Sequence, residues 1–192
     1  MSRLVPPVVP PGSLGGNEQP VLRGERGAVL RPWTGADTAA VVEAFSDPDI
    51  QRWHFRRMDA TEAREWVGAW EPRWRAETDV SWAICAADDG EATGYIAVRD
   101  MTLEFGWGAI SYWMRPMFRR RGLATAATRA VAVWAFDNVG LHRLEIRHSI
   151  DNTESCGVAT NAGFPYEGTM KSALLHADGW HDVHVHARLG GS

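Results

Sequence analysis

Two spacings of apolar residues divide the chain into predicted strands and helices. Across residues 183–189 apolar and polar side chains alternate strictly, which is typical of a strand with one buried face. Across residues 123–138 the spacing becomes that of an alanine-rich helix, which ends near Gly140. The two spacings together predict the order β-α-α-β-β-β-α-β-α-β-β, an α/β mixture in the α+β sense with one central sheet.

The predicted elements follow these patterns and their flanking turn residues. The strands cover residues 28–33, 80–87, 93–100, 107–114, 141–150, 166–175 and 183–189. The helices cover residues 37–45, 61–74, 123–138 and 153–161. Asp88-Asp89-Gly90-Glu91 indicates a hairpin turn, and Asp47-Pro48 indicates the end of the first helix.

Composition predicts one globular unit. Of 192 residues, 45% are hydrophobic and 23% charged, the balance of a soluble domain. Residues 1–26 are rich in proline and glycine and lack either spacing, so we expect a flexible tail before a single domain over 27–192. No apolar run approaches the roughly 20 residues of a membrane span, and residues 1–16 lack a secretory pattern. Cys85 and Cys156 cannot form a disulfide framework, so we expect a cytoplasmic protein with no membrane partner.

The charge is distributed unevenly. The formal net charge is −4, yet residues 112–150 hold seven arginines against two acidic residues. Nucleic-acid binding usually needs a basic surface spread over one face, so we expect no nucleic-acid partner. A basic segment in an acidic chain indicates a local anionic ligand instead.

The segment Met114–Ala124 (MRPMFRRRGLA) is where that ligand is expected to bind. A strand stops before Pro116, an arginine-rich loop follows, and a long helix starts around Gly122. The first N–H groups of a helix lack intrahelical acceptors and carry about half a positive charge, which suits a pyrophosphate. The alternative is a solvated basic loop. The segment contains neither GxxxxGK[ST] nor GxGxxG.

Here a family resemblance becomes specific. Arg119-x-x-Gly122-x-Ala124 resembles the [QR]xxGx[GA] pyrophosphate loop of the GNAT acetyltransferase superfamily. The chain also resembles the RimJ/RimL-type branch, whose namesakes acetylate ribosomal-protein N-termini. Three later motifs carry this resemblance: Asn152-Thr153-Glu154-Ser155, Gly163-Phe164 and Glu167-Gly168. The resemblance covers about residues 28–189. It implies a mixed, mostly antiparallel sheet of about seven strands, flanked by about four helices and splayed between strands four (107–114) and five (141–150).

The resemblance also implies roles for individual residues, with acetyl-CoA as the acyl donor. The backbone of Tyr112, Trp113 and Met114 would bond the pantetheine arm, and a backbone N–H near Trp113 would polarise the thioester carbonyl. The pyrophosphate would be held by N–H groups of Arg119, Arg120, Arg121, Gly122, Leu123 and Ala124. Asn152 would contact the pantetheine amide or orient the acceptor. Ser155 would protonate the departing thiolate, although a polar residue at a helix start is an equally simple interpretation.

The general base is the least determined part of the predicted site. Positions that carry a carboxylate or tyrosine in many family members are here Gly108, Ala159 and Leu174. Glu104, four residues before Gly108, is a candidate that would act through water, and so are His176 and His184.

These features predict an acetyl-CoA-dependent N-acetyltransferase. A neutral amine would attack the thioester directly in a ternary complex, without a metal, and the histidines near the C-terminus lack metal-ligand spacing. The acceptor is either a peptide N-terminus or a small amine. An α-amine with a pKa of about 8 is about a tenth neutral at pH 7, whereas the neutral fraction of a lysine is far smaller. An enzyme with a poor general base therefore favours an acceptor amine of low pKa. The alternative is a non-catalytic acyl-CoA-binding sensor or scaffold.

Three tryptophans follow helical spacing at Trp66, Trp70 and Trp74. Such a stripe is typical of a core, and the alternative is that one or two rings line the acceptor cleft. A homodimer would be another way to bury this Trp-rich surface.

Overall fold

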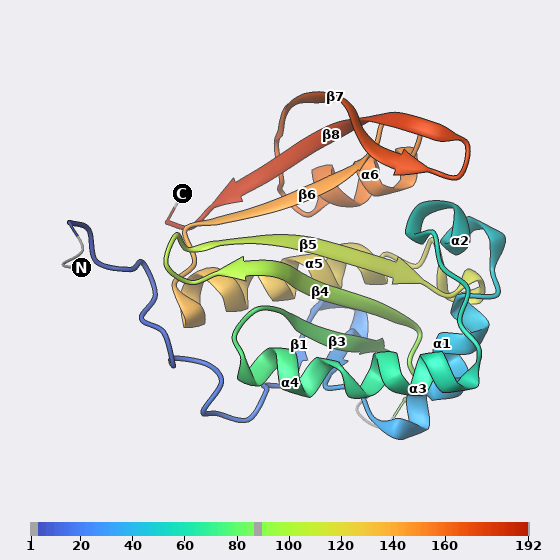
Figure 1. Ribbon diagram of the computed structural model, residues 1–192, viewed down its shortest axis with the longest axis horizontal. Helices are drawn as coiled ribbons and strands as arrows, with labels where there is room; N and C mark the ends of the chain where they lie inside the picture. Colours follow the sequence, from blue (N-terminus) through green and yellow to red (C-terminus); the bar gives the residue numbers. More distant parts are fainter. Residues whose placement is uncertain (1–3, 87–89, 192) are drawn as a thin grey trace.

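The computed structural model describes residues 4–86 and 90–191, and its strands form one eight-stranded sheet (Figure 1). The order across the sheet is β1-β2-β3-β4-β5-β6-β8-β7. The strands are β1 (Leu22–Arg23), β2 (Val29–Arg31), β3 (Val80–Cys85), β4 (Gly94–Thr102), β5 (Trp107–Met114), β6 (Arg143–Ser149), β7 (Tyr166–His176) and β8 (Gly179–Leu189). All neighbouring strands are antiparallel except β5 and β6, which confirms the predicted fold class. The predicted turn at Asp88-Asp89 lies outside the described residues.

The parallel pair β5–β6 separates part-way along its length. Its register runs from Trp107 opposite Arg143 to Ile110 opposite Ile146 and stops there. Beyond that point β5 continues to Met114 and β6 to Ser149, and the two strands diverge toward α2 (Figure 1). The predicted splay is confirmed, and it leaves one edge of β5 beyond Ile110 without a strand partner.

Helices cover both faces of the sheet. The helices are α1 (Thr38–Ala44), α2 (Pro48–His54), α3 (Ala60–Gly68), α4 (Trp70–Arg75), α5 (Leu123–Val133) and α6 (Thr153–Asn161). Alternate residues of β4 point to opposite faces: Tyr95 and Ala97 pack with α1 and α3, whereas Ile96 and Val98 pack with α5. Among the described residues, no helix has both the length and the apolar character needed to cross a membrane.

Helix boundaries depart from the prediction at two prolines. Asp47-Pro48 begins α2 instead of merely ending α1, because the Asp47 side chain accepts the Ile50 N–H at 3.0 Å and Pro48 needs no acceptor at the first helical position. The predicted helix over 61–74 is two helices. Pro72 has no N–H to bond the carbonyl of Gly68, four residues earlier, and the helix is interrupted at Ala69. The long helix from Leu123 continues past Val133 as a π-helical turn, Trp134–Val139, before Gly140 ends it.

The segment predicted as a flexible tail packs against the domain. Val9 and Leu14 are buried, and Glu77 accepts the backbone N–H groups of Gly12, Leu14 and Gly15. The indole N–H of Trp74 donates to the Asn17 carbonyl at 2.9 Å. Because side chains from distant helices and strands hold this segment, it needs no periodic pattern of its own.

The tryptophan stripe belongs to the core. Trp70 and Trp74 are 2% and 3% exposed, and Trp66 packs edge-on against Trp70 with ring centres 5.2 Å apart. None of the three lines the cleft described below. Trp70 and Trp74 are therefore covered within one chain, and Trp66 is half-buried.

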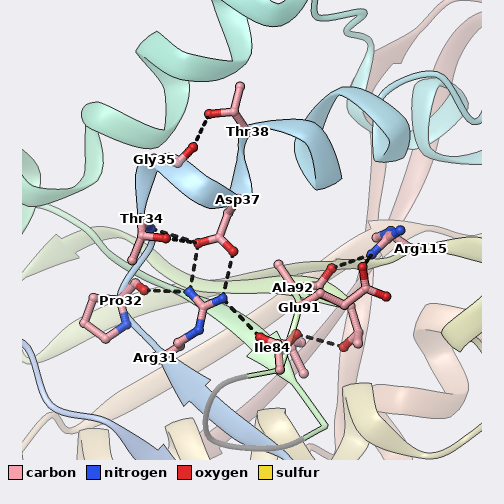
Figure 2. A network of polar contacts seen from close by, with 12 residues as sticks. Arg31, Pro32, Thr34, Gly35, Asp37, Thr38, Ile84, Glu91, Ala92 and Arg115 are labelled. Carbon is pink, nitrogen blue, oxygen red and sulfur yellow. Dashed lines mark hydrogen bonds and ion pairs between the residues drawn. The ribbon is translucent and has the colours of Figure 1, made fainter.

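Two ion-pair groups fasten the α1 layer to the sheet (Figure 2). The guanidinium of Arg31 bonds both carboxylate oxygens of Asp37 at 2.8 and 2.7 Å, and Thr34 donates to the same carboxylate. Arg115, the residue after β5, bonds Glu43 at 2.6 Å and Glu91 at 3.2 Å. The end of β5 is therefore fixed at the point where the sheet splays.

Candidate active site

A cleft of about 680 Å³ opens where β5 and β6 diverge. Its walls are the end of β5, the loop before α5, the first turns of α5 and α6, the end of β6, α2 and part of β7. Every residue predicted to bind the acyl donor lies along this cleft, as does Ser155. Glu104 does not.

The first turn of α5 is an uncapped helix end that faces the cleft. Gly122 has φ of 76°, a left-handed conformation, and among the described residues no side chain caps the helix. The first intrahelical bond runs from the Ala126 N–H to the Gly122 carbonyl, so the amides of residues 123–125 precede it. An added Cβ at Gly122 would lie 2.9 Å from Nε of Arg26. Arg26 thus brings a cation that the sequence pattern did not reveal.

The three loop arginines differ in their partners. Arg119 bonds Asp47 at 2.5 Å and Asp49 at 2.8 Å, and its backbone N–H donates to the Pro116 carbonyl. Arg119 therefore holds the loop to α2. The Arg119 N–H was predicted to hold the pyrophosphate, but in the structure it donates within the loop. Arg120 and Arg121 are at the rim, where the Arg120 side chain is 90% exposed.

The splayed end of β5 presents backbone groups of Tyr112 and Met114. The Arg115 N–H donates to Thr93 in the β4 direction, and strand amides alternate in direction. The N–H groups of Tyr112 and Met114 therefore point away from β4 toward the cleft, and that of Trp113 points toward β4. The carbonyl of Met114 accepts from Nε of Arg119 on the cleft side, in agreement with this alternation.

The start of α6 forms the opposite wall. Oδ1 of Asn152 accepts the Ser155 N–H at 3.0 Å, which caps the helix. The Tyr112 hydroxyl crosses the splay and donates to the Ser155 carbonyl at 3.2 Å. Burial raises the pKa of Tyr112, which keeps its phenol protonated as a donor. The half-buried Ser155 side chain lies on the cleft beside this contact.

Glu104 is removed from the candidate bases. It lies in the turn between β4 and β5, where its carbonyl accepts the Val8 N–H. The length of β5 separates this turn from Met114, a distance of about 23 Å at the usual rise per strand residue. At Gly108 a Cβ would lie 2.4 Å from Cγ1 of Val98, so core packing excludes the carboxylate that family members carry there.

A hydrogen-bonded series at the end of β6 offers another proton acceptor. The Ser149 hydroxyl lies 2.7 Å from Nδ1 of His181, whose Nε2 lies 2.8 Å from Asp178. With Nε2 protonated toward Asp178, Nδ1 accepts the hydroxyl proton of Ser149. The hydrogen bond from His181 lowers the pKa of Asp178, so the carboxylate stays ionised. Ser149 lines the cleft, and the pairing of β8 with β6 places His181 behind it.

The remaining end of the cleft is lined by rings from α2 and β7. Trp53 and His176 meet edge-on with centres 5.5 Å apart, and Nε2 of His176 is buried without a hydrogen-bond partner in the described structure. Burial lowers the pKa of His54 to about 4, although its bond to the Tyr112 carbonyl acts in the opposite direction. His54 is therefore neutral near pH 7, and Arg52 of α2 brings a positive charge to the same end. Asp151 adds a carboxylate to the cleft lining nearby.

A family comparison agrees with this geometry. The model of the acetyltransferase (GNAT) domain matches residues 28–165, which is most of the chain. The chain belongs to the GNAT acetyltransferase family. It is thus an acyltransferase of the N-acetyltransferase class, as the loop and α6 motifs predicted.

Individual relatives support the RimJ/RimL-type resemblance. The chain is 24% identical over 170 residues to the uncharacterized N-acetyltransferase YoaA of Bacillus subtilis, covering 88% of this chain and 96% of that protein. It is 31% identical over 80 residues to the ribosomal-protein-serine acetyltransferase of Escherichia coli, covering 42% and 45%. The solved structure of Mycobacterium smegmatis RimJ in complex with CoA-disulfide superposes with a TM-score of 0.78 at 26% identity, over 88% of this chain and 86% of that one.

Proposed function

We propose that the protein transfers the acetyl group of acetyl-CoA to the α-amine at a peptide or protein N-terminus, by direct attack in a ternary complex. The observation that carries the proposal is one cleft bounded by two unfilled backbone features. They are the uncapped N-terminus of α5 and the free edge of β5. The names of two relatives, a ribosomal-protein-serine acetyltransferase and a RimJ bound to CoA-disulfide, agree with a protein acceptor and a CoA donor.

The donor lies with its pyrophosphate on the amides of residues 123–125. Arg26 beside Gly122 and the exposed Arg120 add positive charge at this end. The pantetheine arm continues along β5 as an added strand, bonded by the cleft-facing backbone of Tyr112 and Met114 and contacted by Asn152. The thioester then lies where β5 and α6 face each other, close to Ser155.

Acetyl transfer follows from groups at that point. The amine nitrogen attacks the thioester carbon, and the developing oxyanion is held by the Met114 N–H, a contact of a kind that contributes about 3 kcal/mol. The carbon–sulfur bond breaks, and Ser155 gives its proton to the thiolate. The amine proton passes through the Ser149 hydroxyl to His181, which Asp178 orients. His181 then releases this proton to solvent, and solvent returns a proton to Ser155.

The acceptor end favours a chain terminus over a lysine. The walls contributed by Trp53 and His54 are aromatic, and the lowered pKa of His54 keeps its ring neutral, which favours the neutral form of an amine. An α-amine reaches that form at a pKa of about 8, whereas a lysine must lose a proton at about 10.4. The Asp151 carboxylate at the cleft attracts the ammonium before it is deprotonated.

Release of free CoA from acetyl-CoA, measured across matched peptides, tests this function. One peptide has a free α-amine and no lysine, the second has a blocked N-terminus and one lysine, and small diamines form a third group. We expect release with the first peptide alone and a mass increase of one acetyl group at its N-terminus. Release with the lysine peptide or the diamines alone would contradict the acceptor assignment.

One observation favours a second function. The packing of Gly108 against Val98 excludes the carboxylate that many family members carry at this position. A sensor that binds acyl-CoA without catalysing transfer needs no such base. CoA binding without release on any acceptor would support the sensor and contradict the transferase.

A further inference from the structure

Three histidines and a cysteine meet on one face of the β6–β8 pair. His148 lies directly opposite His184 in the antiparallel register, and His186 is two residues farther along β8. Cys156 reaches the same place from α6. One ligand atom from each of the four residues lies within 4.8 Å of the other three.

Hydrogen bonds orient two of the imidazoles toward the centre of this cluster. Nδ1 of His148 bonds the Ser149 carbonyl at 2.7 Å, and Nδ1 of His186 bonds the Phe164 carbonyl at 3.1 Å. A nitrogen beside a carbonyl must carry the hydrogen, so the Nε2 atom of each ring has a free lone pair. Backbone carbonyls commonly orient metal-binding histidines in this way.

The inward-facing atoms lack other partners. Nε2 of His148 and Nδ1 of His184 are buried with no hydrogen bond in the described structure. Nε2 of His186 faces only the Sγ atom of Cys156, at 3.8 Å. Burial and the two neighbouring histidines lower the pKa of His148, which favours the neutral form that binds metals. Buried polar atoms are rarely left unpaired, and here the unpaired nitrogens converge with the Cys156 sulfur on one place.

We propose that His148, Cys156, His184 and His186 form a binding site for a divalent cation of the Zn²⁺ type. Imidazole nitrogens and thiolates are the ligand types that tetrahedral zinc sites use, whereas hard cations such as Mg²⁺ prefer oxygen. Tetrahedral geometry places the three nitrogens and the sulfur about 3.3–3.6 Å apart, so shifts of the side-chain atoms by about 1 Å close the site. Binding replaces the thiol hydrogen of Cys156, and the proton goes to solvent.

The site would connect α6 to the sheet next to the catalytic wall. Cys156 follows Ser155 directly, and His148 lines the cleft. Four protein ligands leave no open position, so the cation has a structural role: it fixes the first turn of α6 against β6 and β8. The sequence indicated no such site because His148 and Cys156 lie far in the chain from the two β8 histidines.

Cobalt titration of the metal-free full-length protein tests the site directly. Co²⁺ should produce a thiolate-to-metal charge-transfer band and intense visible bands of four-coordinate cobalt, both lost when one equivalent of Zn²⁺ is added. Cys156→Ser should lose the charge-transfer band, and His184→Gln should weaken Zn²⁺ binding at least about tenfold. The matched controls Cys85→Ser and His142→Gln, whose residues lie outside the cluster, should behave as the unmodified protein.

A second readout covers variants that fail to fold. In the unmodified protein, Zn²⁺ should slow alkylation of Cys156 at least about tenfold, mapped by mass spectrometry, and should raise the Tm, whereas Mg²⁺ should do neither. A folded protein that shows no charge-transfer band would overturn the proposal. So would a band that persists in Cys156→Ser, or alkylation that Zn²⁺ leaves unchanged. None of these results depends on transferase activity.

Discussion

Two regions of the molecule differ in how completely their polar groups are paired. Around Asp37 the charges are internally paired: Arg31 and Thr34 satisfy its carboxylate (Figure 2). The terminal nitrogens of Arg115 bond Glu43 and Glu91. Along the cleft the α5 amides are uncapped, and Nε2 atoms of His148 and His176 are buried without partners in the described structure.

The comparison separates groups that hold the fold from groups that await a ligand. A buried polar atom left unpaired costs free energy, so it persists where another molecule pairs with it. Nε of Arg115 is also buried without a partner, but both its terminal nitrogens are bonded. Changes in the cleft should therefore affect ligand binding and turnover, and changes around Asp37 should affect stability.

The largest effect is expected at the mouth of α5. Gly122→Glu places a side chain and a negative charge beside the amides that hold the pyrophosphate, so CoA binding measured by calorimetry should be abolished. The substitution also forces a non-glycine residue into positive φ. Gly163→Glu is the matched control, because Gly163 has φ of 83° and open space around it. If both variants bind CoA alike, the pyrophosphate does not lie at Gly122.

The next effect concerns Ser155. Ser155→Ala removes the hydroxyl but keeps the backbone bonds to Asn152 and Tyr112, so turnover should fall about 10²-fold with CoA affinity unchanged. Thr160→Ala, on the exposed side of the same helix, should keep full turnover. An unaltered rate in Ser155→Ala would leave this residue with only a structural role in α6.

The paired region should respond in stability alone. Asp37→Asn leaves the Arg31 guanidinium without its charge partner and should lower the free energy of unfolding by about 3 kcal/mol, measured with urea. Affinity for CoA should not change. Glu71→Gln removes the exposed ion pair between Glu71 and Arg75, whose charged atoms are 3.7 Å apart, and should lower the free energy of unfolding by less than about 0.5 kcal/mol. Equal losses in the two variants would show that the Asp37 network is not what fastens α1.

The smallest effect is a pH dependence at the acceptor end. The pKa of His54 is lowered to about 4 in the folded protein, mainly by burial, from an ordinary value near 6.5. Its neutral state supports folding above that ordinary value, and this support is lost as the pH falls toward 4. The unmodified protein should therefore lose about 2 kcal/mol between pH 7 and 5 that His54→Asn does not lose. Parallel pH curves of unfolding would contradict the buried, neutral state of His54.

Local signals predicted most of the fold and half of the site. Alternation over 183–189 and helical spacing from Leu123 each describe one segment, and the structure confirms both. The segment before β1 could not be predicted, because its partners Trp74 and Glu77 are distant in the chain. Asp47-Pro48 fits a helix end and a helix start equally well.

The site shows the same division. The α5 mouth and the α6 start are contiguous motifs, so sequence alone located them. The Ser149–His181 contact and the histidine–cysteine cluster depend on the β6–β8 register, which no single segment encodes. Arg119 lines the cleft, but only the fold shows that its guanidinium pairs with Asp47 and Asp49.

The central claim is that the α5 amides hold the donor's pyrophosphate. Amide chemical shifts of the ¹⁵N-labelled protein test it most directly, with CoA compared against pantetheine, which lacks the pyrophosphate. We expect CoA to move the amide signals of Leu123, Ala124 and Thr125 strongly, and pantetheine to move those of Tyr112 and Met114 but not these three. Saturation with CoA that leaves the three α5 amides unmoved would contradict the account.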